Sequence, residues 1–413
     1  MVHHAVLIVE DSRAYRKYLG ALLEKLGVEL MLADCYQSAV QQLAQPEATH
    51  IICAVLDYCL PDAQDGEVVD LLLNHNIPSI VLTAHVNDDI RRRLLAKGIL
   101  DYILKDSAAS VAYLAPLIQR LIDNLKHTAL VVDDSVMIRR HMCQLLQRSY
   151  IHCLEAENGQ EGLEVLKNND QITLVIVDHD MPVKNGVTMI QETMSLFPRH
   201  KFMLLGVSAS NDRSITSQFL KAGANDFLHK PFNQDEFYCR VNNLLNLKDS
   251  NDRMFHLANK DALTGLWNRR FFFDHIYTTT NLISIAMLDL DHFKKINDRY
   301  GHAKGDEVLI AVAQCMQSLF PEQQHDMVAR FGGEEFCIYS SRNFSEVIDK
   351  LEQLIQQIGH LRFQHQGQEF STTISIGLFC GYQDISTLVN RADDLLYQAK
   401  KSGRNQLIYR PKQ

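Results

Sequence analysis

The sequence has no long apolar run, no dense cluster of basic residues and no cysteine pair with metal-ligand spacing. No uninterrupted apolar stretch approaches the roughly 20 residues that a membrane helix needs. The first four residues lead directly into an apolar, strand-like run, so we expect no signal peptide and a cytoplasmic location. A net charge of −9 without a dense Lys/Arg run argues against a dedicated nucleic-acid binder and against a basic face for anionic lipid.

The cysteines also show no pattern that indicates a disulfide framework or a metal site. They are nine, an odd number, none forms a Cys-x-x-Cys pair, and most lie among apolar residues. This distribution is typical of buried, reduced thiols in a cytoplasmic protein. We therefore predict that all nine are reduced, namely Cys35, Cys53, Cys59, Cys143, Cys153, Cys239, Cys315, Cys337 and Cys380.

An internal repeat organises the N-terminal part of the chain. The 413 residues, 46% hydrophobic and 22% charged, are enough for two to four globular domains. Each copy of the repeat carries an acidic pair, a lone Asp, a hydroxyl residue and a Lys, at offsets of 121–125 residues. These residues are Glu10, Asp11, Asp57, Thr83 and Lys105 in the first copy, and Asp133, Asp134, Asp178, Ser208 and Lys230 in the second.

The hydrophobic pattern of each copy predicts its fold class. Short Val/Ile/Leu runs alternate with amphipathic stretches such as 14–26 and 136–146. Strands that are apolar throughout and alternate with helices predict a parallel sheet with both faces covered. The polar residues all follow apolar runs, and doubly wound sheets bind ligands at the carboxyl ends of their strands. We therefore expect each copy to gather its polar residues around one crevice.

These groups suit phosphoryl transfer to an aspartate. The acidic pair can hold Mg²⁺, which offsets the repulsion between a carboxylate and a phosphoryl donor. The Lys ammonium and the hydroxyl can then hold the new phosphoryl oxygens. The residues resemble the response-regulator receiver family over 1–125 and 126–248. The resemblance implies two flavodoxin-like, doubly wound receiver domains, served by a cognate sensor histidine kinase or phosphotransfer protein.

The receiver resemblance also assigns roles. It implies that Asp57 and Asp178 accept the phosphoryl group, that the two acidic pairs ligate Mg²⁺, and that the hydroxyl and Lys of each copy sense the phosphoryl state. Tyr102 and Phe227, three residues before each Lys, match the aromatic switch position of the family. Both copies retain every chemical group, so we expect both to be competent.

The two copies differ beside these residues. Lys230 is followed by Pro231, as the family expects, whereas Lys105 is followed by Asp106. The missing proline leaves open how the last loop of the first receiver transmits a signal. Asp180, two residues after the second acceptor, adds a carboxylate that could change the lifetime of the phosphoryl group.

The connections between domains are short. Residues 112–125 are predicted to form the last helix of the first receiver, and 126–128 lead directly into the next strand. Residues 249–262 are predicted to be a helical linker. The polar stretch 246–253 leaves open whether that helix is continuous or is interrupted near 249–251.

A further set of motifs lies in the C-terminal part. Residues 330–336, Arg-Phe-Gly-Gly-Glu-Glu-Phe, place two glycines between strand-like runs and follow them with two acids. This predicts a tight hairpin whose glycines take positive φ and admit a phosphate close to the backbone. A strand that ends in Asp289 could meet Glu334 and Glu335 across a sheet. Three carboxylates so placed suggest a divalent metal over a polyphosphate.

Four segments, 261–270, 288–306, 330–336 and 392–405, together resemble the GGDEF family of diguanylate cyclases. The resemblance implies an α+β, nucleotidyl-cyclase-like GGDEF domain over 263–413. Its implied activity is the condensation of two GTP molecules into cyclic di-GMP and two pyrophosphates, with Mg²⁺ as the cofactor.

The GGDEF resemblance implies a role for each site residue. Asp289, Glu335 and the Leu290 carbonyl would ligate Mg²⁺, and Glu334 would deprotonate or hold the ribose 3′-hydroxyl. The substrate-binding positions are Gly332, Gly333, Phe293 and Lys294 near the phosphates, Asn297 and Asp306 at guanine, and Lys400 and Arg404 as a triphosphate clamp. A carboxylate can accept the paired N–H donors of guanine, which adenine lacks. Lys400 and Arg404 are four apart on a predicted helix end, so we expect them on one face.

The chemistry also predicts an assembly. One site holds one GTP while the product needs two reciprocal links, so we expect a homodimer that forms through the receivers. The alternative is a scaffold whose GGDEF domain binds GTP or a partner without catalysis, which degeneration of the motifs would favour; none is seen. A cyclase of mixed or adenine dinucleotides is a third reading, against which Asp306 argues. Residues 323–326, Gln-Gln-His-Asp, replace the Arg-x-x-Asp of many members, so we expect weak or absent product inhibition through this site.

Overall fold

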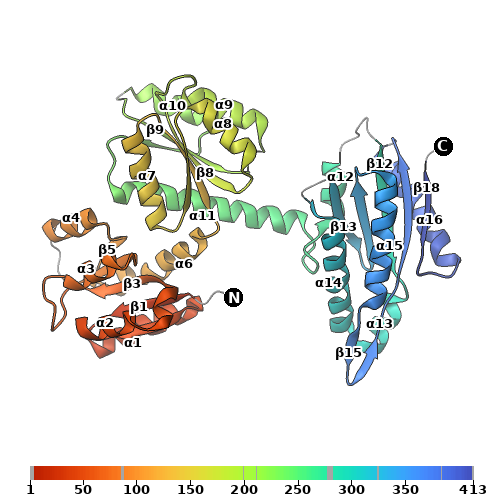
Figure 1. The fold of residues 1–413 in the computed structure, drawn as a ribbon, viewed down its shortest axis with the longest axis horizontal. Helices are drawn as coiled ribbons and strands as arrows, with labels where there is room; N and C mark the ends of the chain where they lie inside the picture. Colours follow the sequence, from red (N-terminus) through yellow and green to blue (C-terminus); the bar gives the residue numbers. More distant parts are fainter. Residues whose placement is uncertain are drawn as a thin grey trace. The chain divides into compact units, whose positions relative to one another are not determined.

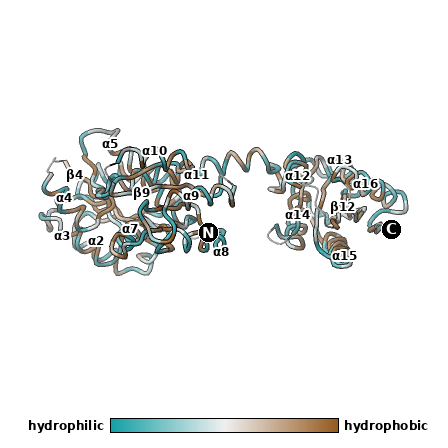
Figure 2. Tube along the Cα trace, turned by 90° about the horizontal axis from the view of Figure 1, so that it is seen from above, coloured by the Kyte–Doolittle hydropathy of each residue, from teal (hydrophilic) through white to brown (hydrophobic). Residues whose placement is uncertain are grey.

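The computed structural model describes residues 4–84, 88–198, 200–210, 212–276, 282–322, 325–382 and 384–411. The chain divides into two compact units, Met1–Asn251 and Asp252–Gln413 (Figure 1). Hydrophobic residues gather inside each unit (brown in Figure 2), while hydrophilic segments lie mostly at its periphery. No helix of the described ranges is both long enough and apolar enough to cross a membrane.

The first copy of the repeat forms a five-stranded parallel sheet in the order β2-β1-β3-β4-β5. All five residues of β1 are buried, as expected of a strand that is covered on both faces. The strands are β1 (Ala5–Val9), β2 (Glu29–Ala33), β3 (Ile51–Asp57), β4 (Ser79–Thr83) and β5 (Asp101–Leu104). The helices are α1 (Arg13–Leu23), α2 (Tyr36–Leu43), α3 (Glu67–Asn74), α4 (Asp88–Lys97), α5 (Ala108–Ala112) and α6 (Leu114–Asn124).

The second copy repeats this topology, with the order β10-β9-β8-β6-β7. Its strands are β6 (Thr128–Val132), β7 (His152–Ala156), β8 (Ile172–Asp178), β9 (Met203–Ser208) and β10 (Asp226–His229). Its helices are α7 (Val136–Arg148), α8 (Gly159–Asn168), α9 (Gly186–Leu196), α10 (Arg213–Ala222) and α11 (Gln234–Asn259). The two parallel sheets confirm the predicted pair of flavodoxin-like, doubly wound folds.

The linker helix that follows the second copy is continuous and forms the C-terminal part of α11. It runs without a break from Gln234 to Asn259 and therefore passes through 249–251. Its N-terminal part packs Phe237, Val241 and Leu245 into the second copy. The predicted linker helix is thus the continuation of the last helix of the second copy.

The two copies contact each other through polar groups. Arg120 of α6 donates from Nη1 to Asp249 Oδ2 at 2.7 Å and to Asn246 Oδ1 at 3.0 Å, both on α11. The hydroxyl of Tyr150 donates to the Ile52 carbonyl at 2.8 Å. The Arg120 bonds hold the first copy against α11, and the Tyr150 bond holds it against the turn between α7 and β7.

The second unit contains a six-stranded sheet in the order β11-β13-β14-β12-β17-β18. Every residue of the central strand β12 is buried, because helices cover both faces of the sheet. The strands are β11 (Trp267–Asn268), β12 (Ile283–Leu290), β13 (Asp326–Gly332), β14 (Glu335–Ser340), β17 (Ile374–Gly381) and β18 (Leu407–Pro411), with a separate hairpin of β15 (Phe363–His365) and β16 (Gln368–Phe370). The helices are α12 (Arg269–His275), α13 (Phe293–Tyr300), α14 (His302–Leu319), α15 (Phe344–His360) and α16 (Ile385–Lys401). This mixed sheet with helices confirms the predicted α+β domain.

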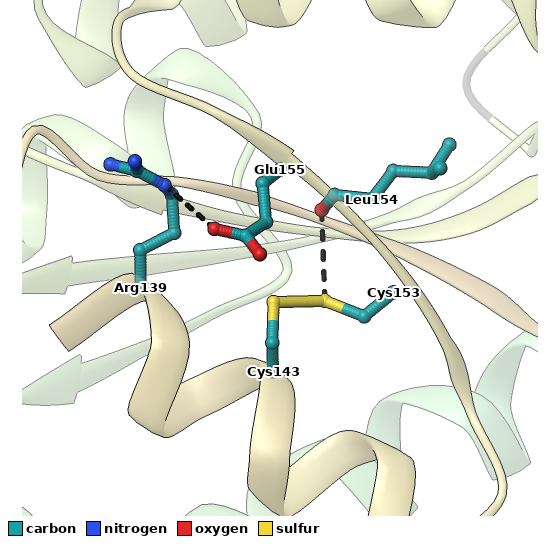
Figure 3. Close-up of a disulfide and its surroundings, with 5 residues drawn as sticks. All are labelled: Arg139, Cys143, Cys153, Leu154 and Glu155. Atoms are coloured by element: carbon teal, nitrogen blue, oxygen red, sulfur yellow. Dashed lines mark hydrogen bonds and ion pairs between the residues drawn. A yellow bond between two sulfur atoms is a disulfide. The ribbon is translucent and has the colours of Figure 1, made fainter. Parts of the chain in front are cut away.

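The prediction of nine reduced cysteines is wrong for one pair. A disulfide joins Cys143 of α7 to Cys153 of β7, whose Cα atoms are 5.7 Å apart (Figure 3). A short turn between α7 and β7 brings the two thiols together, and a separation of ten residues is not a recognised pairing signal. The other seven cysteines are free.

Candidate functional site

The first copy gathers its acids where β1 and β3 end. Carboxylate oxygens of Glu10, Asp11 and Asp57 all lie within 4.8 Å of one another. Lys105 Nζ lies 2.7 Å from Glu10 Oε2 and 2.6 Å from Asp57 Oδ2. Burial raises the pKa of Glu10, and the hydrogen bond and charge of Lys105 oppose that shift. The ammonium therefore offsets part of the negative charge of a group of carboxylates that could hold a divalent cation.

The second copy builds the same arrangement. Oxygens of Asp133, Asp134 and Asp178 lie within 4.8 Å of one another. Lys230 Nζ lies 2.6 Å from both Asp133 Oδ2 and Asp178 Oδ1. Burial raises the pKa of Asp178, against the lowering effect of Lys230. Among the described residues, these two trios are the groups of three or more His, Cys, Asp or Glu side chains whose ligand atoms lie this close together.

The hydroxyl residues end the neighbouring strands. Thr83 ends β4 and Ser208 ends β9, and both are buried. The backbone N–H of Lys105 donates to the Thr83 carbonyl at 2.7 Å, and that of Lys230 donates to the Ser208 carbonyl at 2.9 Å. Parallel pairing thus brings each hydroxyl residue next to the Lys with which the sequence grouped it.

The two residues predicted to be aromatic switches differ in burial. Phe227 is buried and packs against the rings of Phe219 and His229. Tyr102 is only partly buried. The added carboxylate, Asp180, is exposed and lies 2.7 Å from Nδ1 of His179.

The loop after Lys105 has a defined structure without proline. Ser107 caps α5 by accepting from the backbone N–H of Ser110 at 3.1 Å. Asp106 accepts from the hydroxyl of Ser110 at 2.6 Å. In the second copy, Lys230 precedes Pro231 through a cis peptide bond. The two copies therefore reach similar Lys positions through different loops.

In the second unit, the sheet register brings the acids together. Asp289 of β12 lies opposite Glu335 of β14 in an antiparallel pair. The backbone N–H of Leu290 donates to the Glu334 carbonyl at 3.4 Å. Lys400 Nζ lies 2.7 Å from Asp289 Oδ2. Burial raises the pKa of Asp289, and Lys400 opposes that shift.

The hairpin turn between β13 and β14 is shifted by one residue from the prediction. The turn residues are Gly333 and Glu334, while Gly332 pairs with Glu335. Both glycines have positive φ, 148° at Gly332 and 53° at Gly333, so both positions favour glycine. No neighbouring atom lies within 4 Å of where a Cβ would stand at either position. The space over the turn is therefore open to a ligand.

Two adjacent helices hold the guanine candidates. The Asn297 Oδ1 atom on α13 is buried and has no hydrogen-bond partner. It lies 1.9 Å from where a Cβ would stand at Gly305 of α14, so only glycine fits there. Asp306 follows on α14 and is exposed. At the start of α13, Phe293 is buried and Lys294 is exposed.

The prediction that Lys400 and Arg404 share a helix face is wrong. The helix α16 ends at Lys401, and Arg404 lies in the following turn with φ 65°. Gly403 takes a positive φ, and the Arg404 N–H donates to the Ala399 carbonyl at 3.0 Å, a helix-ending arrangement. Burial raises the pKa of Asp289, and the charge of Arg404 is the smallest of the effects that oppose this rise.

Sequence reasoning missed Asp291. Its buried carboxylate accepts from the hydroxyls of Thr373 and Ser375, both at 2.7 Å, and from the Asn405 N–H at 3.0 Å. It thereby ties the end of β12 to β17 and to the turn that carries Arg404. The Asp289-Leu-Asp291 spacing could have suggested that Asp291 also contributes to the site. Its hydrogen-bond partners are too distant in sequence for any local pattern to indicate them.

The segment 323–326, which precedes the hairpin strand β13, is described only at His325 and Asp326. Gln323 and Gln324 lie outside the described residues. The side chain of Asp326 is fully buried and accepts from Ser340 Oγ at 2.6 Å and from Arg342 Nε at 2.8 Å. Its carboxylate is therefore committed to internal partners.

Comparisons with known proteins match both parts of the chain. The family model for the response regulator receiver domain matches residues 6–113 and 129–242, and the model for the diguanylate cyclase GGDEF domain matches 258–406. The response regulator PleD of Caulobacter vibrioides is 27% identical over 98% of both chains. The diguanylate cyclase DgcM of Escherichia coli K12 is 35% identical over 41% of this chain and 43% of its own. A solved two-component response regulator/GGDEF protein is 34% identical, with a TM-score of 0.55 over 60% of this chain and 99% of its own.

Proposed function

Because this chain belongs to the response regulators that carry two receiver domains and a GGDEF domain, we propose that it is a phosphorylation-regulated diguanylate cyclase. The observation that carries the proposal is the pairing of Asp289 with Glu335 across β12 and β14, with Lys400 at 2.7 Å. The reaction joins two GTP molecules into cyclic di-GMP and releases two pyrophosphates.

The acids of this site fit a hard divalent cation, which we propose to be Mg²⁺. Asp289, Glu335 and the Leu290 carbonyl offer only oxygen donors, the ligand type that Mg²⁺ prefers. A bound Mg²⁺ would offset charge on the attacked phosphoryl group and on the departing pyrophosphate. Lys400, which pairs with Asp289 here, would move to the triphosphate when GTP binds.

The remaining residues orient the nucleotide. Gly332 and Gly333 offer an open backbone surface to the phosphates, and Lys294 and Arg404 add positive charge. Glu334, at the turn, would hold or deprotonate the ribose 3′-hydroxyl. Displacement then forms the 3′-oxygen bond to the α-phosphorus and breaks the bond to the β-phosphate oxygen, which leaves as pyrophosphate.

Guanine recognition falls to α13 and α14. The partnerless, buried Oδ1 of Asn297 supports this role, because a buried acceptor without a donor costs free energy until a ligand supplies one. Asp306 can accept the ring N–H and amino protons of guanine. ATP offers no such donor pair, which favours GTP as the substrate.

The receivers would supply the switch. Asp57 and Asp178 would accept phosphoryl groups at the Mg²⁺ held by each acidic trio, with a histidine kinase or a phosphotransfer protein as the source. Phosphorylation would favour a homodimer through the receivers, so that two GTP-loaded half-sites face each other. We expect these events in the cytoplasm.

The regulatory part is tested with beryllofluoride, which mimics the acyl phosphate. The purified full chain is assayed for dimer fraction by light scattering and for cyclic di-GMP formation, with and without beryllofluoride. We expect both to rise, and an Asp57→Asn, Asp178→Asn double variant to respond in neither. If the wild type changes in neither quantity, the switch is wrong. GTP binding without conversion would favour the scaffold.

A further inference from the structure

The two receivers surround their lysines differently. In the first receiver, Lys105 Nζ lies over the ring of Tyr15, 4.8 Å from its centroid. The acidic pairs are 123 residues apart, so the equivalent position in the second receiver is Ile138. No aromatic ring lies over Lys230 in the described part of the chain. The aromatic contact is therefore particular to the first receiver.

The backbone after each lysine differs in the opposite sense. Pro231 restricts the chain directly after Lys230, because its ring fixes φ and limits the preceding residue. Lys105 is followed by Asp106, which imposes no such restriction. The first receiver, which lacks a proline after its lysine, is thus the one in which an aromatic ring contacts that lysine.

The ring of Tyr15, rather than its hydroxyl, makes the contact. The hydroxyl is buried and has no hydrogen-bond partner. Burial, with smaller effects from Glu10 and other charged neighbours, raises the pKa of Tyr15 to about 12, so the side chain stays neutral. The Lys105 side chain is only 12% exposed, and a cation over an aromatic face is held more strongly when water is largely excluded.

We propose that Tyr15 is a positioning residue of the first receiver, whose ring holds the Lys105 ammonium between Glu10 and Asp57. It takes the place of the backbone restraint that Pro231 provides in the second receiver. The inference rests on the proposed phosphoacceptor role of Asp57. The Tyr15 hydroxyl contributes nothing to it, so phenylalanine should replace tyrosine without loss.

The kinetic test follows phosphorylation of Asp57 in the full chain with Asp178→Asn, using acetyl phosphate, Mg²⁺ and intact-mass spectrometry. Tyr15→Leu should slow phosphoryl uptake by about three- to tenfold. Tyr15→Phe should stay close to the parent. The matched control is Ile138→Leu in a chain with Asp57→Asn, which should leave uptake at Asp178 unchanged. Equal rates for Tyr15→Leu and its parent, or a Phe variant as slow as Leu, would overturn the proposal.

A second readout separates this proposal from the phosphoacceptor role. In protein with ¹³C-labelled lysine, the ring current of Tyr15 should shift the Lys105 ε-methylene signal upfield. The shift should persist in Tyr15→Phe and vanish in Tyr15→Leu. A shift without phosphoryl uptake would contradict the proposed function while supporting the positioning role; a parent without the shift would overturn that role.

Discussion

The guanidinium of Arg330 bonds to Asp261, with Nη1 lying 2.9 Å from Asp261 Oδ1. The same side chain donates from Nη2 and Nε to the Gly333 carbonyl at 2.8 and 3.1 Å. Asp261 in turn accepts from the N–H and hydroxyl of Thr264. Arg330 thereby fastens the hairpin turn that carries the catalytic candidates to the segment that follows α11.

This relationship predicts a catalytic effect for Arg330→Ala. The substitution frees the Gly333 carbonyl and leaves Asp261 without its charged partner, at a cost of about 1.5–3 kcal/mol. We expect cyclic di-GMP formation to fall by at least tenfold, because the turn that carries Glu334 loses its anchor. Turnover and unfolding free energy are measured for Arg330→Ala, Asp261→Ala and the double variant. Strictly additive effects on both would contradict the coupling.

The position of Lys400 predicts that its removal strengthens metal binding and weakens GTP binding. Its ammonium lies 2.7 Å from Asp289 Oδ2 and would therefore compete with the proposed cation for that carboxylate. In Lys400→Met without nucleotide, we expect Mn²⁺ or Mg²⁺ to bind about five- to tenfold more tightly, since a neighbouring positive charge is gone. The KM for GTP should rise. Isothermal titration and steady-state kinetics test the pair, with Lys401→Met as the control; weaker metal binding would argue against competition.

Asp326 predicts a loss of stability rather than a loss of product inhibition. Its carboxylate is fully buried on Ser340 and Arg342. Asp326→Ala leaves Ser340 Oγ and Arg342 Nε without their shared partner, although Arg342 Nη1 keeps Glu346 at 2.7 Å, and should cost about 1–3 kcal/mol of unfolding free energy. Titration of cyclic di-GMP against wild-type turnover should show weak or no inhibition. Tight, saturable product binding that Asp326→Ala abolishes without unfolding the domain would refute this.

Asp249 predicts a pH-dependent contribution to the stability of the receiver unit. Burial alone would raise its pKa, but hydrogen bonds from Lys126 and Arg120 lower it below the ordinary 3.8. A carboxyl with a lowered pKa in the folded state stabilises that state above its unfolded pKa and loses this contribution as pH falls through the folded value. Asp249→Asn should thus destabilise the protein at pH 7, and the difference from wild type should shrink below pH 3.8.

Urea unfolding over a pH series checks the Asp249 prediction. Lys126→Met is the matched control, because Lys126 is 57% exposed and its pair should be worth less than about 1 kcal/mol. Arg120 is 6% exposed, so losing its partner should cost more. A difference between Asp249→Asn and wild type that is constant with pH would contradict the assignment.

Several features followed from the sequence because they depend on local pattern. Apolar runs that end in polar residues predicted both parallel sheets and the acidic trios at their carboxyl ends. A strand that ends at Asp289 and a hairpin that ends in acids were enough to expect their meeting. Both inferences rest on geometry that strands impose.

Other features depend on tertiary contacts that no local pattern encodes. Gly403 ends α16 before Arg404, so helical spacing misplaced that guanidinium. Asp291 finds Thr373 and Ser375 only after β12 and β17 pair. Cys143 and Cys153 meet because α7 turns back onto β7. Tyr15 approaches Lys105 from a helix ninety residues earlier in the chain.

We propose that the paired acids of β12 and β14 condense GTP under receiver control. The purified full chain is incubated with GTP and Mg²⁺, with and without acetyl phosphate, and the nucleotides are separated by chromatography. The Asp289→Asn and Glu335→Gln variants are assayed in parallel. We expect cyclic di-GMP and pyrophosphate from the wild type and more of both with acetyl phosphate. Either variant should form at least a hundredfold less, which corresponds to about 2.7 kcal/mol of activation free energy. Wild-type protein that binds GTP but yields no cyclic dinucleotide under either condition would contradict this proposal.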